Sequence, residues 1–356
     1  MEVVPSCIIL KPLILSEKIA ITDSETLYEV LDCLTDNISL HTQGACDKRK
    51  LFEILVRAAS CEDSIENTAK ILNQTPCVND IRYHLKKIDN FEELETQINA
   101  ALQSKLPNGI KKGRHKIAID LNLIPDYGEA SESEEVYIYR SEAKSGTCSF
   151  YAYATLYVLT QGKRVTLSIR GIRRFDTNVA IITYLLSDIS SLKLRVKKLY
   201  LDRGFFSVPV IRWLQALDIA FVMPAIRRGK QGGINQFWKG KRSFKTTYPM
   251  NRSKDDFVTF NLCVICKYRK GKRGQRGVEY FAYVIYKTQI SLNYIHQDYR
   301  KRFGIESSYR LKNLCRIRTN NKKPVLRLLF VGISFLLVNI VTVHRILKRY
   351  SQKMGY

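Results

Sequence analysis

Residues 115–124 read HKIAIDLNLI, a nearly continuous apolar run that is interrupted by Asp120 and one asparagine. A short apolar run of this kind predicts a buried β-strand. Two further runs follow, FYAYATLYVL at 150–159 and RVTLSIR at 164–170, and both are rich in β-branched and aromatic residues. The short turn at 160–163 that joins them predicts a hairpin. These three strands predict the start of a β-sheet.

Beyond this hairpin, helical and strand patterns alternate along the chain. Apolar residues recur at helical spacing in 178–190 and 207–217, whereas 196–201 and 219–223 are short apolar runs that predict strands. The second helix has Ser at its start and Pro in its first turn, which is typical of helix N-termini. The order β-β-β-α-β-α-β predicts an α/β mixed sheet that begins with antiparallel strands.

A strongly basic segment at about 225–287 departs from this alternation. It holds two strand candidates, 257–266 and 279–286, so we interpret it as a β-rich insertion. Helical patterns return at 291–313 and 325–347.

The chain before the first strand is of a different kind. Residues 1–106 predict a mostly helical N-terminal domain, and the turn-rich basic connector after them marks its boundary. A second domain then covers 107–347, followed by a basic tail at 348–356. The start of the chain has neither the basic region nor the cleavage site of a secretory signal.

The uncharged stretch 328–344 has 17 residues, which is the lower length limit for a membrane span. It contains Gly332, Ser334 and Asn339, and it directly follows a basic helix, so a core helix is favoured. A membrane-associated basic protein remains an alternative, but a membrane partner is not expected.

The charge is distributed unevenly. The 356 residues carry 58 Lys and Arg against 33 Asp and Glu, a formal net charge of +25. Residues 1–100 have 10 basic and 17 acidic residues, and from Ala143 onward 42 basic residues stand against nine acidic ones. Such a field favours a polyanionic partner, most commonly nucleic acid, although an anionic membrane or an acidic protein would also fit.

In a surface of that sign an acidic residue repels a polyanion unless it is paired or holds a metal. Asp120 lies inside an apolar strand, Asp202 ends the strand in LYLDRGFF, and Glu306 lies on a basic helix. Each alone could be a satisfied buried carboxylate, a loop cap or an ion-pair partner. Asp126 competes with Asp120, but its place between Pro125 and Tyr127-Gly128 favours a turn.

The residues around Glu306 favour a functional role for these acids. Tyr299, Arg302, Glu306 and position 313 are spaced so that they share one face of a helix. The pattern resembles the Y-x2-R-x3-E-x6-K signature of insertion-sequence DDE transposases. The last position is Asn313 here, and the neighbouring Arg310 or Lys312 could supply the missing cation.

The resemblance extends to the contexts of Asp120 and Asp202 and to an insertion before the Glu306 helix. It implies an RNase H-like core in which Asp120, Asp202 and Glu306 are catalytic and hold two Mg²⁺ ions, with Mn²⁺ as a substitute. It also implies DNA contacts from Tyr299, Arg302 and a neighbouring cation, either Arg310 or Lys312. For Trp238, which is flanked by cations, a base-stacking platform competes with a buried role.

The resemblance therefore implies a DNA transposase that cleaves the ends of a mobile element and joins 3′-hydroxyls to target DNA. Its expected partners are double-stranded DNA, both terminal inverted repeats and target, and a second copy in a homodimer, with no small-molecule substrate. Residues 1–106 would serve end recognition or subunit contacts. Nine irregularly spaced Cys favour a reducing interior, so a cytoplasmic, nucleoid-associated location is expected. A nuclease without strand transfer and a non-catalytic DNA-binding derivative remain alternatives.

Overall fold

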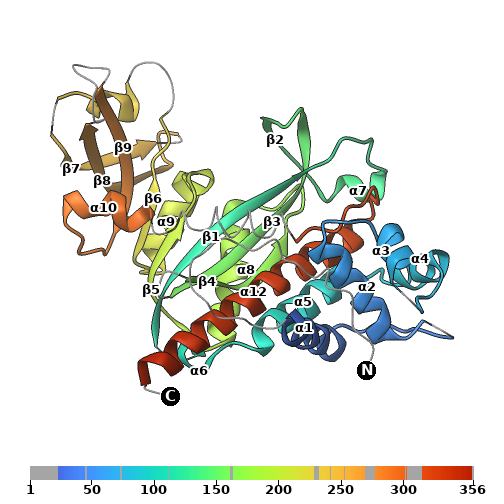
Figure 1. Cartoon of the computed structure of the whole chain (residues 1–356). Helices are drawn as coiled ribbons and strands as arrows, with labels where there is room; N and C mark the ends of the chain where they lie inside the picture. The colour runs from blue at the N-terminus through green and yellow to red at the C-terminus, as the bar shows by residue number, and fades with distance from the viewer. Residues whose placement is uncertain are drawn as a thin grey trace.

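The computed structural model describes residues 23–354 with gaps at 45, 73, 112, 161–162, 228–231, 241, 252, 269–276, 301 and 303–314 (Figure 1).

Helices form the N-terminal part of the described chain, as the sequence predicted. Side chains satisfy the free N–H groups at their starts: Asp47 accepts from the first turn of the second helix, and Asn90 accepts from Glu93 N–H at 3.0 Å in the fifth. The helices are α1 (Asp23–Asn37), α2 (Lys48–Ser60), α3 (Ile65–Ile71), α4 (Val78–Lys86), α5 (Phe91–Ser104) and the short α6 (Asn108–Lys111).

The described strands form one nine-stranded mixed sheet. β1 (Arg114–Pro125) pairs antiparallel with β3 (Thr147–Thr160), which pairs antiparallel with β4 (Lys163–Gly171). On its other edge β1 runs parallel to β5 (Arg195–Leu201), and β5 runs parallel to β6 (Phe221–Pro224). The order β4-β3-β1-β5-β6 is that of an RNase H-like core, so the predicted fold class is confirmed.

The helices of the core follow the predicted alternation. α8 (Asn178–Ser191) lies between β4 and β5, and α9 (Val208–Ala216) lies between β5 and β6. A short 3₁₀ helix, η1 (Arg203–Phe205), follows β5 directly. Before the hairpin, the sequence analysis missed the four-residue α7 (Glu132–Glu135) and the strand β2 (Ile138–Lys144), which pairs with the start of β3.

The predicted β-rich insertion is present and extends the same sheet. It consists of η2 (Gly233–Phe237), β7 (Phe244–Asn251), β8 (Phe257–Tyr268) and β9 (Val278–Tyr286). β9 pairs antiparallel with β6, so the insertion continues the core sheet, and its far end projects away from the N-terminal helices (Figure 1). β7, at the sheet edge, was not predicted.

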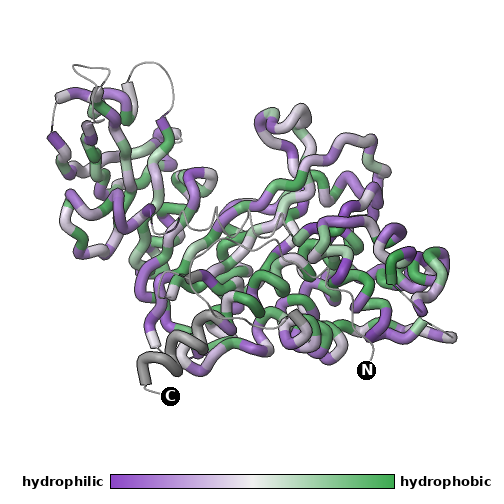
Figure 2. The backbone as a smooth tube through the Cα atoms, viewed as in Figure 1, coloured by the Kyte–Doolittle hydropathy of each residue, from purple (hydrophilic) through white to green (hydrophobic). Residues whose placement is uncertain are grey.

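The two faces of the sheet are covered by different helices. Along β3, Tyr151 and Tyr153 pack in one apolar cluster with α12 (Pro324–Met354) and the N-terminal helices. The alternate residues Ala152 and Ala154 pack in a second cluster with α8 and α9. Figure 2 shows the hydrophobic residues along α12 and the central strands. Asp120 is in phase with Ala118, which belongs to the α12 side.

α12 is the central helix of that side. By length and composition, Pro324–His344 could cross a membrane, with a mean hydropathy of 2.2, but 78% of this apolar window is buried inside the fold. The helix approaches α5 closely at Gly332, where a Cβ atom would lie 2.7 Å from Ile98 Cδ1. The burial is that of a core helix.

Side chains close the outer edge of β4. The Asn99 side chain donates to Ile169 O (3.0 Å) and accepts from Ile169 N–H (2.8 Å), so it mimics a paired strand. The Asn339 side chain of α12 does the same for Thr166, at 2.7 and 2.8 Å. Gln103 adds a bond to Leu167 O at 3.1 Å. The N-terminal helices and α12 thus supply the partners that an edge strand otherwise lacks.

A buried carboxyl also joins α5 to β4. Glu95 is 5% exposed and accepts from Gly171 N–H at 2.6 Å. Burial raises the pKa of Glu95 to about 7, against the opposing effects of the Gly171 N–H and Arg170.

We expect Asn339→Leu to destabilise the fold because it leaves the buried N–H and C=O of Thr166 without partners. Each unsatisfied group costs about 1–3 kcal/mol, so the free energy of unfolding should fall by about 2–5 kcal/mol in chemical denaturation. Ser334→Ala is the matched control, since that hydroxyl donates within α12 to Phe330 O at 2.9 Å. Equal stabilities of Asn339→Leu and the parent would contradict this role.

Glu95→Gln should change how stability depends on pH. Since the pKa is raised from 4.5 to about 7 in the folded state, the stability from protonated Glu95 is full below pH 4.5 and is lost as pH rises through 7. Gln keeps an acceptor for Gly171 N–H without a charge. Thermal unfolding should therefore show the variant more stable than the parent at pH 8, by at most about 3 kcal/mol, and similar at pH 4.5. The exposed Glu93→Gln is the control, and a parallel pH profile for parent and Glu95→Gln would refute the explanation.

Candidate active site

Two of the predicted carboxylates meet at neighbouring parallel strands. Ile119 of β1 pairs with Leu201 of β5. Each of them is followed in the chain by an aspartate, Asp120 after Ile119 and Asp202 after Leu201. β5 ends at Leu201, whereas β1 continues and pairs with β3 alone. Carboxyl ends of parallel strands are common ligand sites in α/β sheets.

Asp120 is a buried acid whose carboxylate and backbone carbonyl both accept hydrogen bonds from neighbouring residues. It is 7% exposed, its Oδ1 accepts from Leu121 N–H at 2.9 Å, and its carbonyl accepts from the Thr155 hydroxyl at 3.3 Å. Burial raises the pKa of Asp120 to about 6, while the Arg302 guanidinium opposes this shift and Asp202 adds to it. Asp202 is more open, with its side chain 35% exposed.

Arg302 joins the two carboxylates. Its Nη2 atom lies 2.9 Å from Asp120 Oδ1 and 3.2 Å from Asp202 Oδ1. Its Nη1 atom donates to the Tyr299 hydroxyl at 2.6 Å, and the residue is 6% exposed. The buried Arg302 guanidinium therefore lies at the point where both carboxylates converge.

Tyr299 holds that arginine to the end of β5. It lies on α10 (Leu292–Arg300), is 2% exposed, and its hydroxyl donates to Leu201 O at 3.0 Å. Its ring packs against Tyr283 with centroids 5.2 Å apart. The Tyr299 hydroxyl thus accepts from Arg302 and donates to Leu201 O, next to Asp202. Of the residues predicted to share a helical face, Tyr299 and Arg302 therefore lie at the carboxylates.

Asp298 is a further part of the site. Its carboxylate binds Lys116 Nζ (2.8 Å), Lys198 Nζ (3.0 Å) and the Tyr200 hydroxyl (2.7 Å). Burial alone would raise the pKa of Asp298, but these three donors outweigh it and lower the pKa to about 2. Asp298 therefore ties α10 to both β1 and β5.

The sequence did contain a signal for this cluster. Lys116 precedes Asp120 by four residues, and Lys198 precedes Asp202 by four. Even spacing places each lysine on the same strand face as its aspartate, and the register places the two lysines opposite each other. Two positive charges directly opposite each other on paired strands are unfavourable, so these lysines predict an acidic residue that neutralises both.

Glu306, Arg310, Lys312 and the departure at Asn313 lie outside the described residues.

Trp238 lies on the insertion directly after η2, half-buried, with Arg227 4.7 Å from its ring and Tyr280 stacked at 5.9 Å. None of these contacts is with the aspartates, and a stacking role for Trp238 stays a prediction.

Asp126 is also separate from the pair. It is 5% exposed, its N–H donates to Ser149 O at 2.9 Å, and its carbonyl accepts from the Thr147 hydroxyl at 2.8 Å. It follows the end of β1, six residues beyond Asp120, so the structure pairs Asp120 and not Asp126 with Asp202.

The donor set at the pair fits a hard divalent cation in part. Both acids supply carboxylate oxygens, which Mg²⁺ prefers, and they already converge on one positive group. In the part of the chain that the structure describes, no group of three or more His, Cys, Asp or Glu gathers as a metal site. The described residues thus provide two carboxylates, and Glu306 is the candidate for a third.

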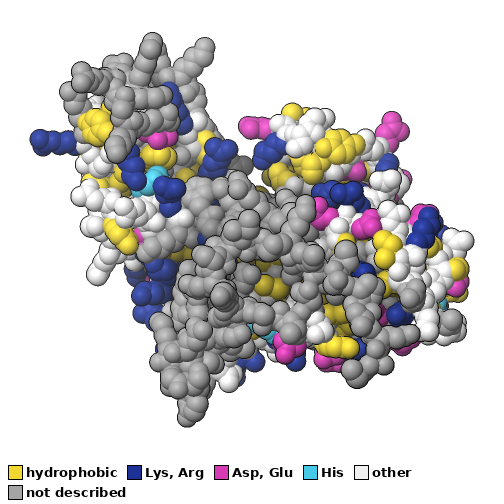
Figure 3. All heavy atoms as spheres, in the orientation of Figure 1, with side chains coloured by type: hydrophobic (Ala, Val, Ile, Leu, Met, Phe, Trp, Pro, Cys, Tyr) yellow, Lys and Arg dark blue, Asp and Glu magenta, His cyan; other side chains and the backbone are white. Residues whose placement is uncertain are grey.

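The surface charge follows the division seen in the sequence. On the face in Figure 3, Lys and Arg side chains gather over the insertion and below it, whereas Asp and Glu are more frequent over the N-terminal helices and the β2 region. The basic side is the side of β5, β6 and the insertion (Figures 1 and 3).

Comparison with known proteins gave a family match and a distant structural match. The model of the family described as "Transposase DDE domain" matches residues 140–340. The match includes Asp202, Tyr299 and Arg302 and begins after Asp120. A search of curated proteins found no match.

Among solved structures, the chain is similar to a piggyBac transposase in a synaptic complex with hairpin DNA, determined by cryo-EM, with a TM-score of 0.48 and 11% identity. The similarity covers 90% of this chain and 65% of that one, so this chain spans less than two thirds of that protein's length. Since the family model covers more than half of the 356 residues, the chain belongs to the transposase DDE domain family.

Proposed function

We propose that this protein is a DNA transposase that cleaves DNA at the ends of a mobile element and joins the 3′-hydroxyl to target DNA. The observation that carries the proposal is the convergence of Asp120 and Asp202 on one cation position, beside the Tyr299–Arg302 pair. Membership of the transposase DDE domain family supports it.

In this proposal Asp120, Asp202 and Glu306 would hold two divalent ions, Mg²⁺ or Mn²⁺. When bound, the ions would activate the attacking oxygen and stabilise the leaving oxygen in an in-line displacement at phosphorus. The attacking oxygen, from water in cleavage and from the 3′-hydroxyl in joining, forms the new P–O bond as the bond to the leaving oxygen breaks.

The surrounding residues position the DNA. Arg302, once no longer needed to neutralise the aspartates, can donate two parallel N–H groups to a phosphate. Tyr299 binds the guanidinium of Arg302 and is itself anchored to Leu201 O, and the Asp298 cluster fixes α10 on the sheet. Arg310 or Lys312 would add a further phosphate contact, and Trp238 a base contact on the insertion.

The basic part of the chain supports DNA as the partner, because each neutralised phosphate releases counterions. Two ends must be cut together, so we propose a homodimer around paired element ends. The N-terminal helices, which carry more acidic than basic residues, would serve subunit contacts better than phosphate binding.

The cleavage proposal is tested with labelled linear DNA taken from both flanks of the coding region. We expect the parent protein to cut it in Mg²⁺ and to form joined products with a target plasmid. Asp202→Asn should reduce both by about 10²-fold or more, because metal stabilisation of the transition state is worth several kcal/mol. Asp218→Asn, at an exposed acid that pairs with Lys287, is the control and should act as the parent.

Undiminished cleavage by Asp202→Asn would overturn the mechanism. Cleavage without joined products would favour a nuclease that lacks strand transfer.

Removing the cation between the aspartates should expose their mutual repulsion. Arg302→Gln is expected to lower the melting temperature in EDTA, since two adjacent carboxylates then lack a counter-charge. Added Mg²⁺ should raise the melting temperature of this variant more than that of the parent. Arg300→Gln, at an exposed arginine that ends α10, is the control. An equal Mg²⁺ response in Arg302→Gln and Arg300→Gln would argue against a metal site at this pair.

A further inference from the structure

A pocket separate from the aspartate pair lies at the far end of β1. Its volume is about 480 Å³, and it is formed by the residues after β1, the segment 316–322 and the start of α12. The lining residues are Ile124, Pro125, Asp126, Tyr127, Gly128, Arg316, Ile317, Thr319, Asn320, Lys322, Arg327, Phe330, Val331 and Ser334. The volume is within the range of small-molecule sites.

The pocket contains a buried acid that the fold does not use. Asp126 is 5% exposed, and its backbone N–H and C=O are bonded to Ser149 and Thr147. Its carboxylate has no hydrogen-bond or ion-pair partner among the described residues. Because Asp126 lines the pocket, these carboxylate oxygens are available to accept hydrogen bonds from a bound ligand.

Three cations border the same pocket. Arg316 is exposed, Lys322 extends past Gly128 to donate to Glu129 O at 2.7 Å, and Arg327 lies 5.2 Å over the Tyr151 ring. The end of the Lys322 side chain lies directly over Gly128, where a Cβ atom would displace it.

The apolar part of the lining comes from the end of β1 and from α12, including Ile124, Phe330 and Val331. These features together match a nucleotide. The apolar wall would contact the flat base, the basic rim would bind the phosphate, and the Asp126 carboxylate would accept hydrogen bonds from the N–H groups of the base.

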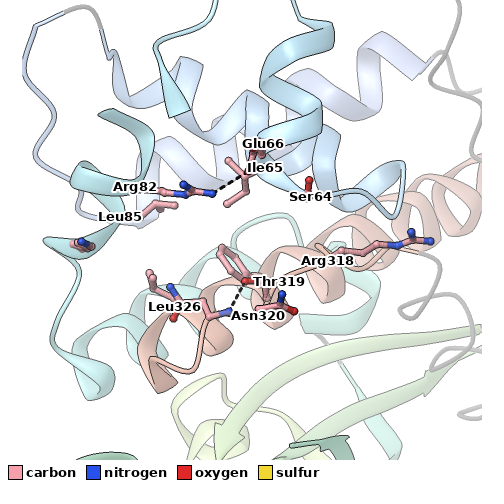
Figure 4. Close-up of a pocket in the computed structure, with 12 residues that line it drawn as sticks. Ser64, Ile65, Glu66, Arg82, Leu85, Arg318, Thr319, Asn320 and Leu326 are labelled. Carbon is pink, nitrogen blue, oxygen red and sulfur yellow. Dashed lines mark hydrogen bonds and ion pairs between the residues drawn. The ribbon is translucent and has the colours of Figure 1, made fainter. Parts of the chain in front are cut away.

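The segment that borders this pocket also borders a second hollow. Thr319, Asn320 and Phe330 line both, and the second hollow, of about 470 Å³, opens between this segment and α3 and α4 (Figure 4). In Figure 4, Thr319 and Asn320 lie opposite Ile65 and Leu85. The segment is held there by Arg318 N–H, which donates to Asp63 O at 2.9 Å.

The second hollow adds Arg82, Lys86 and Arg318 to the basic side chains. A nucleic-acid strand that leaves the first pocket would therefore meet further cations on its path.

We propose that the Asp126 pocket binds one unstacked guanine nucleotide of a DNA strand. An ionised carboxylate only accepts hydrogen bonds, and guanine presents two adjacent donors, N1–H and the 2-amino group, on the edge that pairing normally occupies. Arg316, Lys322 and Arg327 bind the flanking phosphates. This inference rests on the proposed function in that it assumes a DNA substrate, but it concerns a site separate from Asp120 and Asp202.

The test compares oligonucleotides that differ by one amino group. Labelled single-stranded thymidine 12-mers with a central guanosine, a central hypoxanthine nucleotide (deoxyinosine) or no substitution are titrated with the full chain in EDTA and followed by fluorescence anisotropy. Loss of one charge-assisted hydrogen bond should weaken binding about tenfold, so the guanosine oligomer should bind about tenfold tighter than the deoxyinosine oligomer.

The variants separate base recognition from phosphate binding. Asp126→Asn should abolish the preference for guanosine over deoxyinosine, because an amide replaces one acceptor with a donor. Arg327→Gln should weaken binding of all three oligomers and keep the preference. Asp255→Asn, at an exposed acid on the insertion, is the control and should behave as the parent.

Equal binding of the guanosine and deoxyinosine oligomers by the parent would overturn the proposal, even if Asp126→Asn fails to fold. The preference should persist in Asp202→Asn, which is expected not to cleave. A guanosine preference in a parent that never cleaves DNA contradicts the proposed enzyme and leaves the pocket supported. Cleavage by a parent without the preference contradicts the pocket alone.

Discussion

The parallel register of β1 and β5 determines the geometry of the site. Because Ile119 lies opposite Leu201, the two aspartates that follow are neighbours, and the two lysines four residues earlier are neighbours as well. One pair concentrates negative charge and the other concentrates positive charge on the same sheet face. Arg302 forms ion pairs with the two aspartates, and Asp298 forms ion pairs with the two lysines. Asp298 lies on α10, and Arg302 lies two residues beyond its end. A one-residue shift in this register would separate all four contacts.

The core strands could be predicted because their own composition identifies them. The runs that became β1 and β3 are buried over most of their length, so each is largely apolar. β7 could not be recognised in this way: it is an edge strand with alternate burial that contains Thr246, Thr247 and Pro249. β2 is likewise exposed over much of its length. Such strands owe their structure to a neighbour that is distant in sequence.

The same limit applies to the site. Asp120, Asp202, Tyr299 and Arg302 were identified from motifs, and the structure brings these four together. The strand partners of Asp298 could not be predicted, because helical spacing reports neighbours on one helix and not residues on strands about a hundred positions away. Asn99 and Asn339 gave no local signal at all, since an amide that pairs with a strand edge resembles any other polar residue on an amphipathic helix.

The closure of β4 by Asn339 has a consequence for how the chain is made. Asn339 lies 173 residues after Thr166, so during synthesis β4 exists well before this partner does. At about 5–20 residues per second, the delay is roughly 10–35 s. During that interval, and permanently in a chain that stops before residue 339, Thr166 presents an open strand edge that another nascent chain can pair with. The helix that carries Asn339 therefore completes the protection of this strand edge against self-association.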